Sequence, residues 1–126
     1  MTRFLRFCAA GTLGYAVDAG LLQALAGLAG ANPYAARALS FLAAASVTWR
    51  VNRRYTFRVE QPPSRDEWGR YVALMGLGAL VNYGVFALGI HASEFLRARL
   101  WLAVALGSVA GLGVNYLSSR RLLADA

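Results

Sequence analysis

The sequence predicts an all-α membrane protein whose four transmembrane helices form two duplicated hairpins. Composition is the first observation, because hydrophobic residues make up 58% of the 126 residues and charged residues only 15%. Soluble globular chains average about 45–50% and about 25%. The spacing of apolar stretches and an internal repeat are the other two observations. A soluble helical bundle is disfavoured, since soluble helices keep a polar face and these stretches lack one.

Four stretches carry no charge or nearly none, at about 7–29, 35–49, 71–90 and 100–119. Crossing a hydrocarbon core of about 30 Å takes roughly 20 helical residues. The first, third and fourth stretches reach that length. The second is short between Arg37 and Arg50, so both arginines would have to extend their side chains to the membrane interfaces.

The arginines predict the orientation of these helices. All 13 basic residues are arginine, and only Arg37, Arg97 and Arg99 belong to the outer side. The other ten lie at the two termini and in the central loop. The positive-inside rule therefore places the N- and C-termini and the central loop in the cytoplasm. A nucleic-acid partner is not expected, because the arginines border lipid-length apolar runs rather than one soluble face.

The first hairpin is expected over about residues 3–57. Its first helix, at about 5–28, contains a single acid, Asp18, near its middle. A secretory signal peptide is the alternative, but the run is long and Asp18 interrupts it. Asn32 and Pro33 predict the N-cap and the first position of the second helix, so the outer connection is short. Small or polar residues then recur at every fourth position of that helix: Ser40, Ala44, Thr48 and Asn52. Such a stripe suits a helix–helix contact in lipid.

A cytoplasmic linker at about 58–69 contains two prolines and joins this hairpin to a second one at about 70–123, so that residues 1–126 form one transmembrane domain. The second hairpin repeats the first. At shifts of 64 and 67 positions the matching pairs include Gly14 with Gly78, Asp18 with Asn82, Thr48 with Asn115, and Arg53-Arg54 with Arg120-Arg121. Each copy starts and ends in the cytoplasm, so the two copies have parallel topology.

Several of these features occur together in one known family. They are an Arg-Phe pair at 6–7, the small residues Gly11 and Gly14, then Asp18, a short outer loop, and a second helix that ends Asn52-Arg53-Arg54-Tyr55-Thr56-Phe57. With its weaker second copy, the chain resembles the GtrA-like family of small four-helix membrane proteins over nearly its whole length. One departure is Thr48-Trp49-Arg50, where the family more often has an Asn-Phe pair and an apolar residue.

The resemblance implies a multi-pass protein of the bacterial inner (cytoplasmic) membrane. Its substrate would be a polyprenyl-phosphate-linked sugar used in cell-surface polysaccharide or cell-wall synthesis. The chain would then either flip this lipid-linked sugar across the membrane or anchor the glycosyltransferase that makes or uses it. A small proton-coupled cation exporter also has four helices and one acid in its first helix, but such exporters often have little arginine bias.

Two expectations concern what accompanies the chain. The sequence contains no metal-ligand spacing, nucleophile elbow or phosphate-cradling glycine loop, so we expect neither enzymatic activity nor a cofactor. Four short helices enclose little volume for a lipid-linked sugar. A homo-oligomer is therefore expected, in addition to the membrane and a possible glycosyltransferase partner.

The candidate substrate-binding residues are of two kinds. Arginines at equivalent cytoplasmic positions can bind the phosphate, since guanidinium matches phosphate bidentately, or can merely anchor the topology: Arg53, Arg54, Arg120 and Arg121. Polar residues within the apolar stretches can line the path of the sugar or hydrogen-bond between helices: Asp18, Thr48, Asn52, Asn82 and Asn115. Asp18 would be structural if Arg37 or Arg97 reached it.

Overall fold

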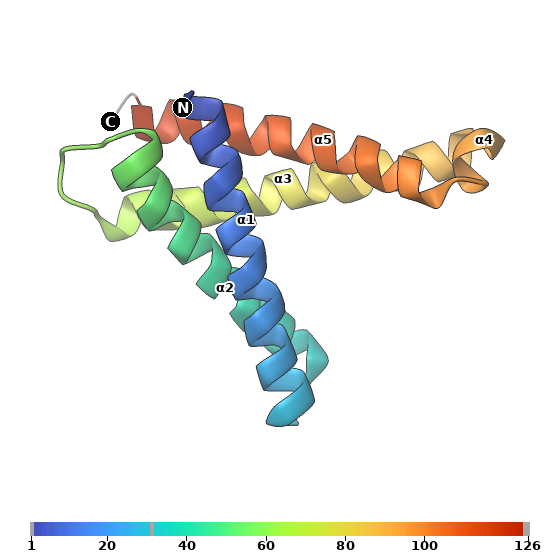
Figure 1. The fold of residues 1–126 in the computed structure, drawn as a ribbon, viewed down its shortest axis with the longest axis horizontal. Helices are drawn as coiled ribbons and strands as arrows, with labels where there is room; N and C mark the ends of the chain where they lie inside the picture. The colour runs from blue at the N-terminus through green and yellow to red at the C-terminus, as the bar shows by residue number, and fades with distance from the viewer. Residues whose placement is uncertain (1, 31, 125–126) are drawn as a thin grey trace.

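The computed structural model describes residues 2–30 and 32–124, which are almost entirely helical (Figure 1). The helices are α1 (Arg3–Leu22), α2 (Pro33–Val51), α3 (Arg65–Ala92), the short α4 (Glu94–Arg97) and α5 (Leu100–Ser119). Three π-helical turns extend them: η1 (Gln23–Leu28), η2 (Asn52–Thr56) and η3 (Arg120–Ala124). Of the described residues 88% are helical, and none of them lies in a strand. The predicted all-α class is confirmed.

Side-chain caps explain where α2 and α3 begin. The Asn32 side chain accepts the backbone N–H groups of Tyr34 and Ala35 at 2.9 and 3.3 Å, and Pro33 occupies the first turn of α2, as predicted. At α3 the Ser64 hydroxyl accepts the Glu67 N–H at 3.1 Å. This cap starts the helix at Arg65, inside the segment that the sequence predicts as linker.

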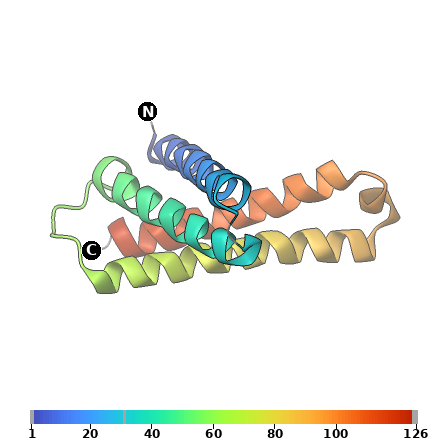
Figure 2. The ribbon, with the colours of Figure 1, turned by 90° about the horizontal axis from the view of Figure 1, so that it is seen from below.

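The four long helices form two antiparallel hairpins, α1 with α2 and α3 with α5 (Figures 1 and 2). The hairpins meet at the end that carries both termini and the linker. From there they diverge, so that the connection between α1 and α2 and the α4 end lie far apart (Figure 1). The two hairpins therefore touch each other mainly at one end, which we call the junction.

Within each hairpin the helices pack closely at equivalent positions. A Cβ atom added to Gly14 would collide with the Thr48 side chain, and one added to Gly78 would collide with the Asn115 side chain. The internal repeat relates these two contacts to each other. Small residues let helix backbones approach closely in membrane proteins, and the duplicated contact follows from that property.

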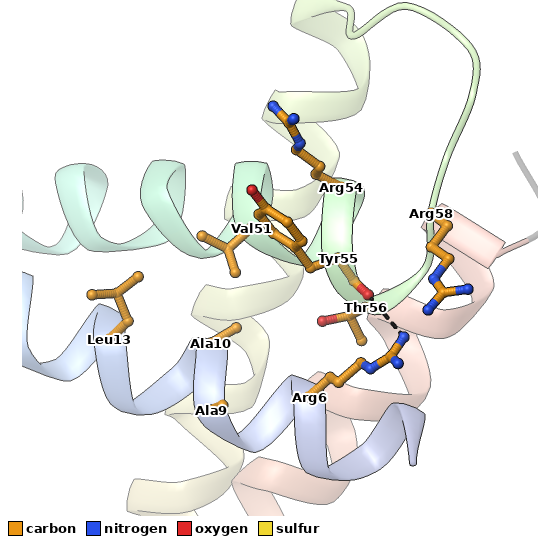
Figure 3. A pocket seen from close by; sticks show the side chains of 9 residues that line it. All are labelled: Arg6, Ala9, Ala10, Leu13, Val51, Arg54, Tyr55, Thr56 and Arg58. Carbon is orange, nitrogen blue, oxygen red and sulfur yellow. Dashed lines mark hydrogen bonds between the residues drawn. The ribbon is translucent and has the colours of Figure 1, made fainter. Parts of the chain in front are cut away.

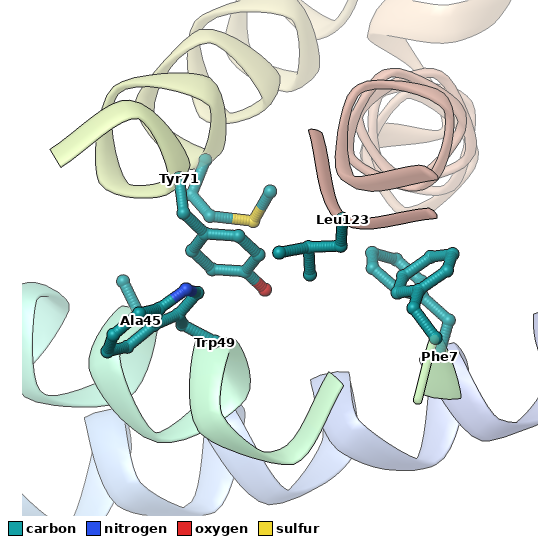
Figure 4. Packing of buried hydrophobic residues seen from close by; sticks show 7 residues of the cluster. Phe7, Ala45, Trp49, Tyr71 and Leu123 are labelled. Carbon is teal, nitrogen blue, oxygen red and sulfur yellow. The ribbon is translucent and has the colours of Figure 1, made fainter. Parts of the chain in front are cut away.

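The junction contains the apolar core (Figure 4). Its buried members come from both hairpins: Phe7, Ala45, Trp49, Phe57, Tyr71, Met75 and Leu123. Tyr116 of α5 adds edge-to-face contacts with Phe4 and Phe7 of α1, at ring-centre distances of 5.2 and 5.3 Å. Aromatic packing thus fastens the first helix to the last one.

Outside the junction, the helices of the second hairpin expose apolar surface. Among the described residues, Arg65–Ala92 and Leu100–Ala124 are the two helices long and apolar enough to cross a membrane by length and composition. Only 6% and 17% of their most apolar windows are buried inside the protein. The core helix of a soluble protein would be largely covered, so this exposure fits helices that face lipid. The count of four spans and the cytoplasmic termini stay predictions.

Candidate functional site

An open pocket of about 600 Å³ lies between α1 and the turn η2 that follows α2 (Figure 3). Its lining combines three arginines with apolar and hydroxyl side chains: Arg6, Ala9, Ala10, Leu13, Val51, Arg54, Tyr55, Thr56 and Arg58. The pocket lies at the junction, near the N-terminus and the linker. Its arginines therefore lie where the sequence predicts the cytoplasmic interface of the membrane.

The backbone of η2 turns sharply beside this pocket. A π turn closes hydrogen bonds over five residues, and here the Phe57 N–H donates to the Asn52 carbonyl at 2.8 Å. Arg58 has a φ of 52°, in the left-handed region that residues other than glycine seldom adopt. The Val59 N–H then donates to the Arg53 carbonyl at 2.8 Å. Backbone outliers of this kind cluster at functional sites, and this one places Arg58 against the pocket.

No carboxylate of residues 2–30 and 32–124 forms an ion pair with a pocket arginine. The ion pairs there use other arginines: Asp18–Arg37, Arg53–Glu67, Asp66–Arg70 and Glu94–Arg97. Arg6 instead donates to the Tyr55 backbone carbonyl at 3.4 Å (Figure 3). The Arg54 guanidinium lies 5.4 Å from the centre of the Tyr55 ring. Three arginines that form no ion pair with a described carboxylate, beside an apolar wall, suit an anionic group attached to an apolar chain.

The four predicted phosphate-binding arginines have different environments. Arg54 lines the pocket. Arg53 is buried and pairs with Glu67, with Nε to Oε2 at 2.6 Å and Nη2 to Oε1 at 3.3 Å. Arg120 and Arg121 are exposed on η3 and lie outside the pocket lining. The sequence repeat predicts two equivalent arginine pairs, but of these four arginines only Arg54 lines this pocket.

A second open pocket, of about 560 Å³, continues past Arg54 and Arg58 towards the linker. Arg50 and Arg53 join its lining, together with one acid, Glu60. The two pockets share Arg54 and Arg58, so the positive surface extends from α1 across η2 to the linker.

Comparison with known families identifies the kind of protein that carries these pockets. The sequence model of the GtrA/DPMS transmembrane domain matches residues 6–124. The chain belongs to the GtrA/DPMS transmembrane-domain family. The match confirms the resemblance drawn from the sequence. Together with the outward-facing apolar helices, it identifies the chain as a membrane protein. Membership of the GtrA/DPMS family suggests involvement in the translocation of lipid-linked sugars or in glycosylation.

In this GtrA/DPMS-family chain, the predicted residues Thr48 and Asn52 meet at the junction in a buried hydrogen-bond network. The Asn52 amide donates to the Tyr71 hydroxyl at 3.0 Å, and that hydroxyl donates to Thr48 Oγ1 at 3.0 Å. Thr56 donates to the Asn52 side-chain oxygen at 2.8 Å. The network joins α2 and η2 to α3, so these two residues hold the hairpins together.

Asp18 lies in the first hairpin, away from the network, and has a partner. Arg37 Nη1 of α2 lies 3.3 Å from Asp18 Oδ2. The repeat places Asn82 and Val104 at the equivalent positions of the second hairpin. Both members of the ion pair are thus uncharged in the other copy. A charge at membrane depth is costly without a partner, and this covariation between the copies favours the structural alternative for Asp18.

Asn82 and Asn115 lie in the contact between α3 and α5. Asn82 packs against Gly107 and Gly111, and Asn115 packs against Gly78 with its side-chain oxygen buried and without a hydrogen-bond partner in the described residues. The five predicted polar residues therefore do not line one path. Two are in the junction network, one is in an ion pair, and two are in a helix–helix contact.

Sequence reasoning missed three residues that the structure places in prominent positions. The sequence does not place Arg6 and Arg58 among the candidate phosphate-binding arginines, although both line the pocket. Tyr71 lies at the repeat position of Phe7, and the pattern of the sequence predicts no partner for its hydroxyl. Its hydroxyl was the available signal, because a tyrosine that replaces a phenylalanine in an apolar helix brings a polar group that has to find a partner.

Proposed function

We propose that this chain binds a polyprenyl-phosphate-linked sugar in the arginine pocket and flips it across the bacterial inner membrane. Three arginines that pair with no carboxylate of residues 2–30 and 32–124, next to an apolar wall, are the observation that carries the proposal. Guanidinium groups bind phosphate through paired N–H donors. The apolar wall formed by Ala10, Leu13 and Val51 would take the first prenyl units.

Pocket size and helix length support the same function. Small-molecule sites usually enclose about 300–1,000 Å³, and a phosphate with one sugar fits within the pocket of about 600 Å³. With their π turns, residues 3–28 and 33–56 form two further helical segments. At about 1.5 Å per residue each exceeds the roughly 30 Å of a hydrocarbon core. We therefore propose four spans, with both termini and the linker in the cytoplasm.

The proposed activity moves a lipid and neither makes nor breaks a covalent bond. It needs no catalytic residue and no cofactor, in accord with the expectation that the chain is not an enzyme. The diverging hairpins are in contact mainly at the junction (Figure 1). A homo-oligomer would enclose a path for the sugar that one copy does not enclose alone.

Translocation in proteoliposomes tests the proposal. The substrate is a fluorescent short-chain polyprenyl-phosphate sugar, and flipping is followed by loss of access to an external quencher. We expect Arg54→Ala to slow flipping at least about tenfold, because one charge-assisted phosphate contact is lost. The matched control is Arg121→Ala, the repeat-equivalent arginine outside the pocket, which we expect to stay within about twofold. Equal rates in empty liposomes and in liposomes with the wild-type protein would contradict the flippase function.

Recruitment of a glycosyltransferase is the second candidate function. The extended positive surface of Arg50, Arg54 and Arg58 at the linker favours it, because such a surface can dock an acidic partner. Charge reversal of Arg50, which lines only the second pocket, separates the two functions. Anchoring predicts that Arg50→Glu abolishes co-purification of the enzyme, whereas flipping predicts translocation close to the wild-type rate. The third alternative, a cation exporter, is disfavoured, because a surface rich in arginine repels a cationic substrate.

A further inference from the structure

Glu67 accepts three hydrogen bonds from the end of the first hairpin. Its carboxylate receives Arg53 Nε at 2.6 Å, Arg53 Nη2 at 3.3 Å and Trp49 Nε1 at 2.8 Å. Only 9% of the Arg53 side chain and 12% of the Glu67 side chain are exposed. We call these three residues, Trp49, Arg53 and Glu67, the Glu67 clasp.

The clasp connects two segments that lie on either side of the irregular stretch between η2 and α3. Trp49 and Arg53 belong to α2 and η2, and Glu67 lies in the first turn of α3. Ser64 caps that turn by accepting the Glu67 N–H. A carboxylate is also favoured near a helix N-terminus by the helix dipole. The start of α3 is therefore a firm support for the clasp.

The clasp also fixes the backbone that presents the pocket arginines. Arg53 directly precedes Arg54, and its carbonyl accepts the Val59 N–H at 2.8 Å. The residues between these two points include Arg54, Arg58 and Tyr55, whose carbonyl holds Arg6. Holding the Arg53 side chain thus restrains both ends of the turn that lines the pocket.

We propose that Glu67 is a positioning residue for the arginine pocket, acting through Arg53 without touching the ligand. In this assignment Arg53 is a structural arginine, and Arg6, Arg54 and Arg58 bind the phosphate. The inference rests on the proposed function, because the phosphate belongs to the polyprenyl-phosphate lipid. The opposing account makes Arg53 a direct phosphate ligand whose charge Glu67 partly cancels.

Glu67→Gln separates the two accounts, with Asp66→Asn as the matched control. Asp66 is the neighbouring acid, and its exposed side chain pairs with Arg70 at 3.1 Å. The measurements use the full chain in nanodiscs. Binding is titrated with a short-chain polyprenyl phosphate, and hydrogen exchange is followed at the amides of Phe57 and Val59. Only folded, monodisperse protein is titrated, so that loss of fold is not counted as loss of affinity.

Positioning predicts that Glu67→Gln weakens binding about tenfold and speeds exchange at both amides, because the buried guanidinium loses its counter-charge and leaves its site. Asp66→Asn leaves both quantities unchanged. The double variant Arg53→Met/Glu67→Gln removes both charges and keeps an acceptor for Trp49. It restores slow exchange and brings the affinity within about threefold of the wild type.

Two results would overturn the positioning role. Unchanged or tighter binding by Glu67→Gln would mean that the clasp does not shape the pocket. Failure of the double variant to regain affinity would make Arg53 itself a ligand. A wild-type protein that does not bind polyprenyl phosphate at all would instead refute the proposed function, and the positioning role with it.

Discussion

The two hairpins share a packing framework but differ in their charges. In the first hairpin the Thr48 side chain packs against Gly14, and in the second the Asn115 side chain packs against Gly78 at the equivalent position. The first hairpin carries the Asp18–Arg37 ion pair and contributes Arg6 and Arg54 to the pocket. The helix contact and several arginines are thus duplicated, whereas the Asp18–Arg37 ion pair is specific to the first copy.

Two acids at the start of α3 add a further difference between the copies. Asp66 pairs with Arg70, and Glu67 pairs with Arg53. The equivalent positions in the first copy are Thr2 and Arg3, neither of which is acidic. Arg6, the counterpart of Arg70, therefore keeps its charge unpaired in the described residues and is free to act in the pocket. The acid Asp66 thus engages Arg70 of the second copy, whereas the equivalent position before Arg6 holds no acid.

The largest effect is expected in the shared framework, where Gly107→Ala breaks the contact between α3 and α5. An added Cβ would collide with the backbone carbonyl of Asn82, which cannot move like a side-chain tip. We expect a loss of about 1–3 kcal/mol of stability, measured by thermal unfolding in detergent. In the control Gly113→Ala, on the same helix, the new Cβ meets no atom within 4 Å. This control should be neutral or stabilise by up to about 1 kcal/mol. Equal melting temperatures for both variants would contradict the close contact.

Tyr71→Phe makes the second copy match the first at its junction position, since Phe7 is the equivalent residue. The change removes a hydroxyl that accepts from Asn52 and donates to Thr48. Leaving buried partners unpaired costs about 1–3 kcal/mol, which thermal unfolding would detect. Tyr83→Phe is the control, because Tyr83 is 70% exposed on the same helix. A Tyr71→Phe protein as stable as this control would mean that the network does not hold the hairpins together.

Asp18 and Arg37 can be replaced by their counterparts from the second copy. Asp18→Asn or Arg37→Val alone should destabilise the protein by about 1 kcal/mol, because each leaves a charge without its partner. The double variant should recover most of that loss, and flipping should recover with it. The measurement is a double-mutant cycle on thermal unfolding and on translocation. If the double variant is folded but translocates no lipid, Asp18 acts directly in transport.

The smallest effect tests the role of the two acids. Thr2→Asp introduces into the first copy the Asp66–Arg70 spacing, four residues before Arg6. Thr2 caps α1, and aspartate is an equally good N-cap, so the helix start should be preserved. Pairing with Arg6 should weaken polyprenyl-phosphate binding by about two- to threefold, and less at high salt. Thr2→Asn caps the helix without a charge and should bind as the wild type does. If Thr2→Asp and Thr2→Asn bind polyprenyl phosphate with equal affinity, Arg6 does not bind the phosphate.

The sequence predicted the framework well because it depends on local and repeated signals. Spacing alone predicts the Asn32-Pro33 helix start, the repeat that matches Gly14 with Gly78 and Thr48 with Asn115, and a helix–helix contact along the stripe that contains Thr48. Spacing does not predict that Arg53 forms an ion pair while Arg54 lines the pocket. This difference depends on which arginine contacts Glu67 across the linker. The sequence also gives no sign of the left-handed φ at Arg58, which brings that side chain to the pocket. Contacts between the hairpins, rather than within them, were the part that spacing could not predict.

Photolabelling tests the arginine pocket most directly. A polyprenyl phosphate with a photoreactive group beside its phosphate would be added to the reconstituted protein, and the labelled peptides would be identified by mass spectrometry. We predict that the label attaches within residues 6–13 and 51–58, which contain the pocket lining, and that Arg54→Ala removes most of it. Labelling confined to residues 115–124 around Arg120 and Arg121, unaffected by Arg54→Ala, would contradict the assignment of the phosphate to the first hairpin.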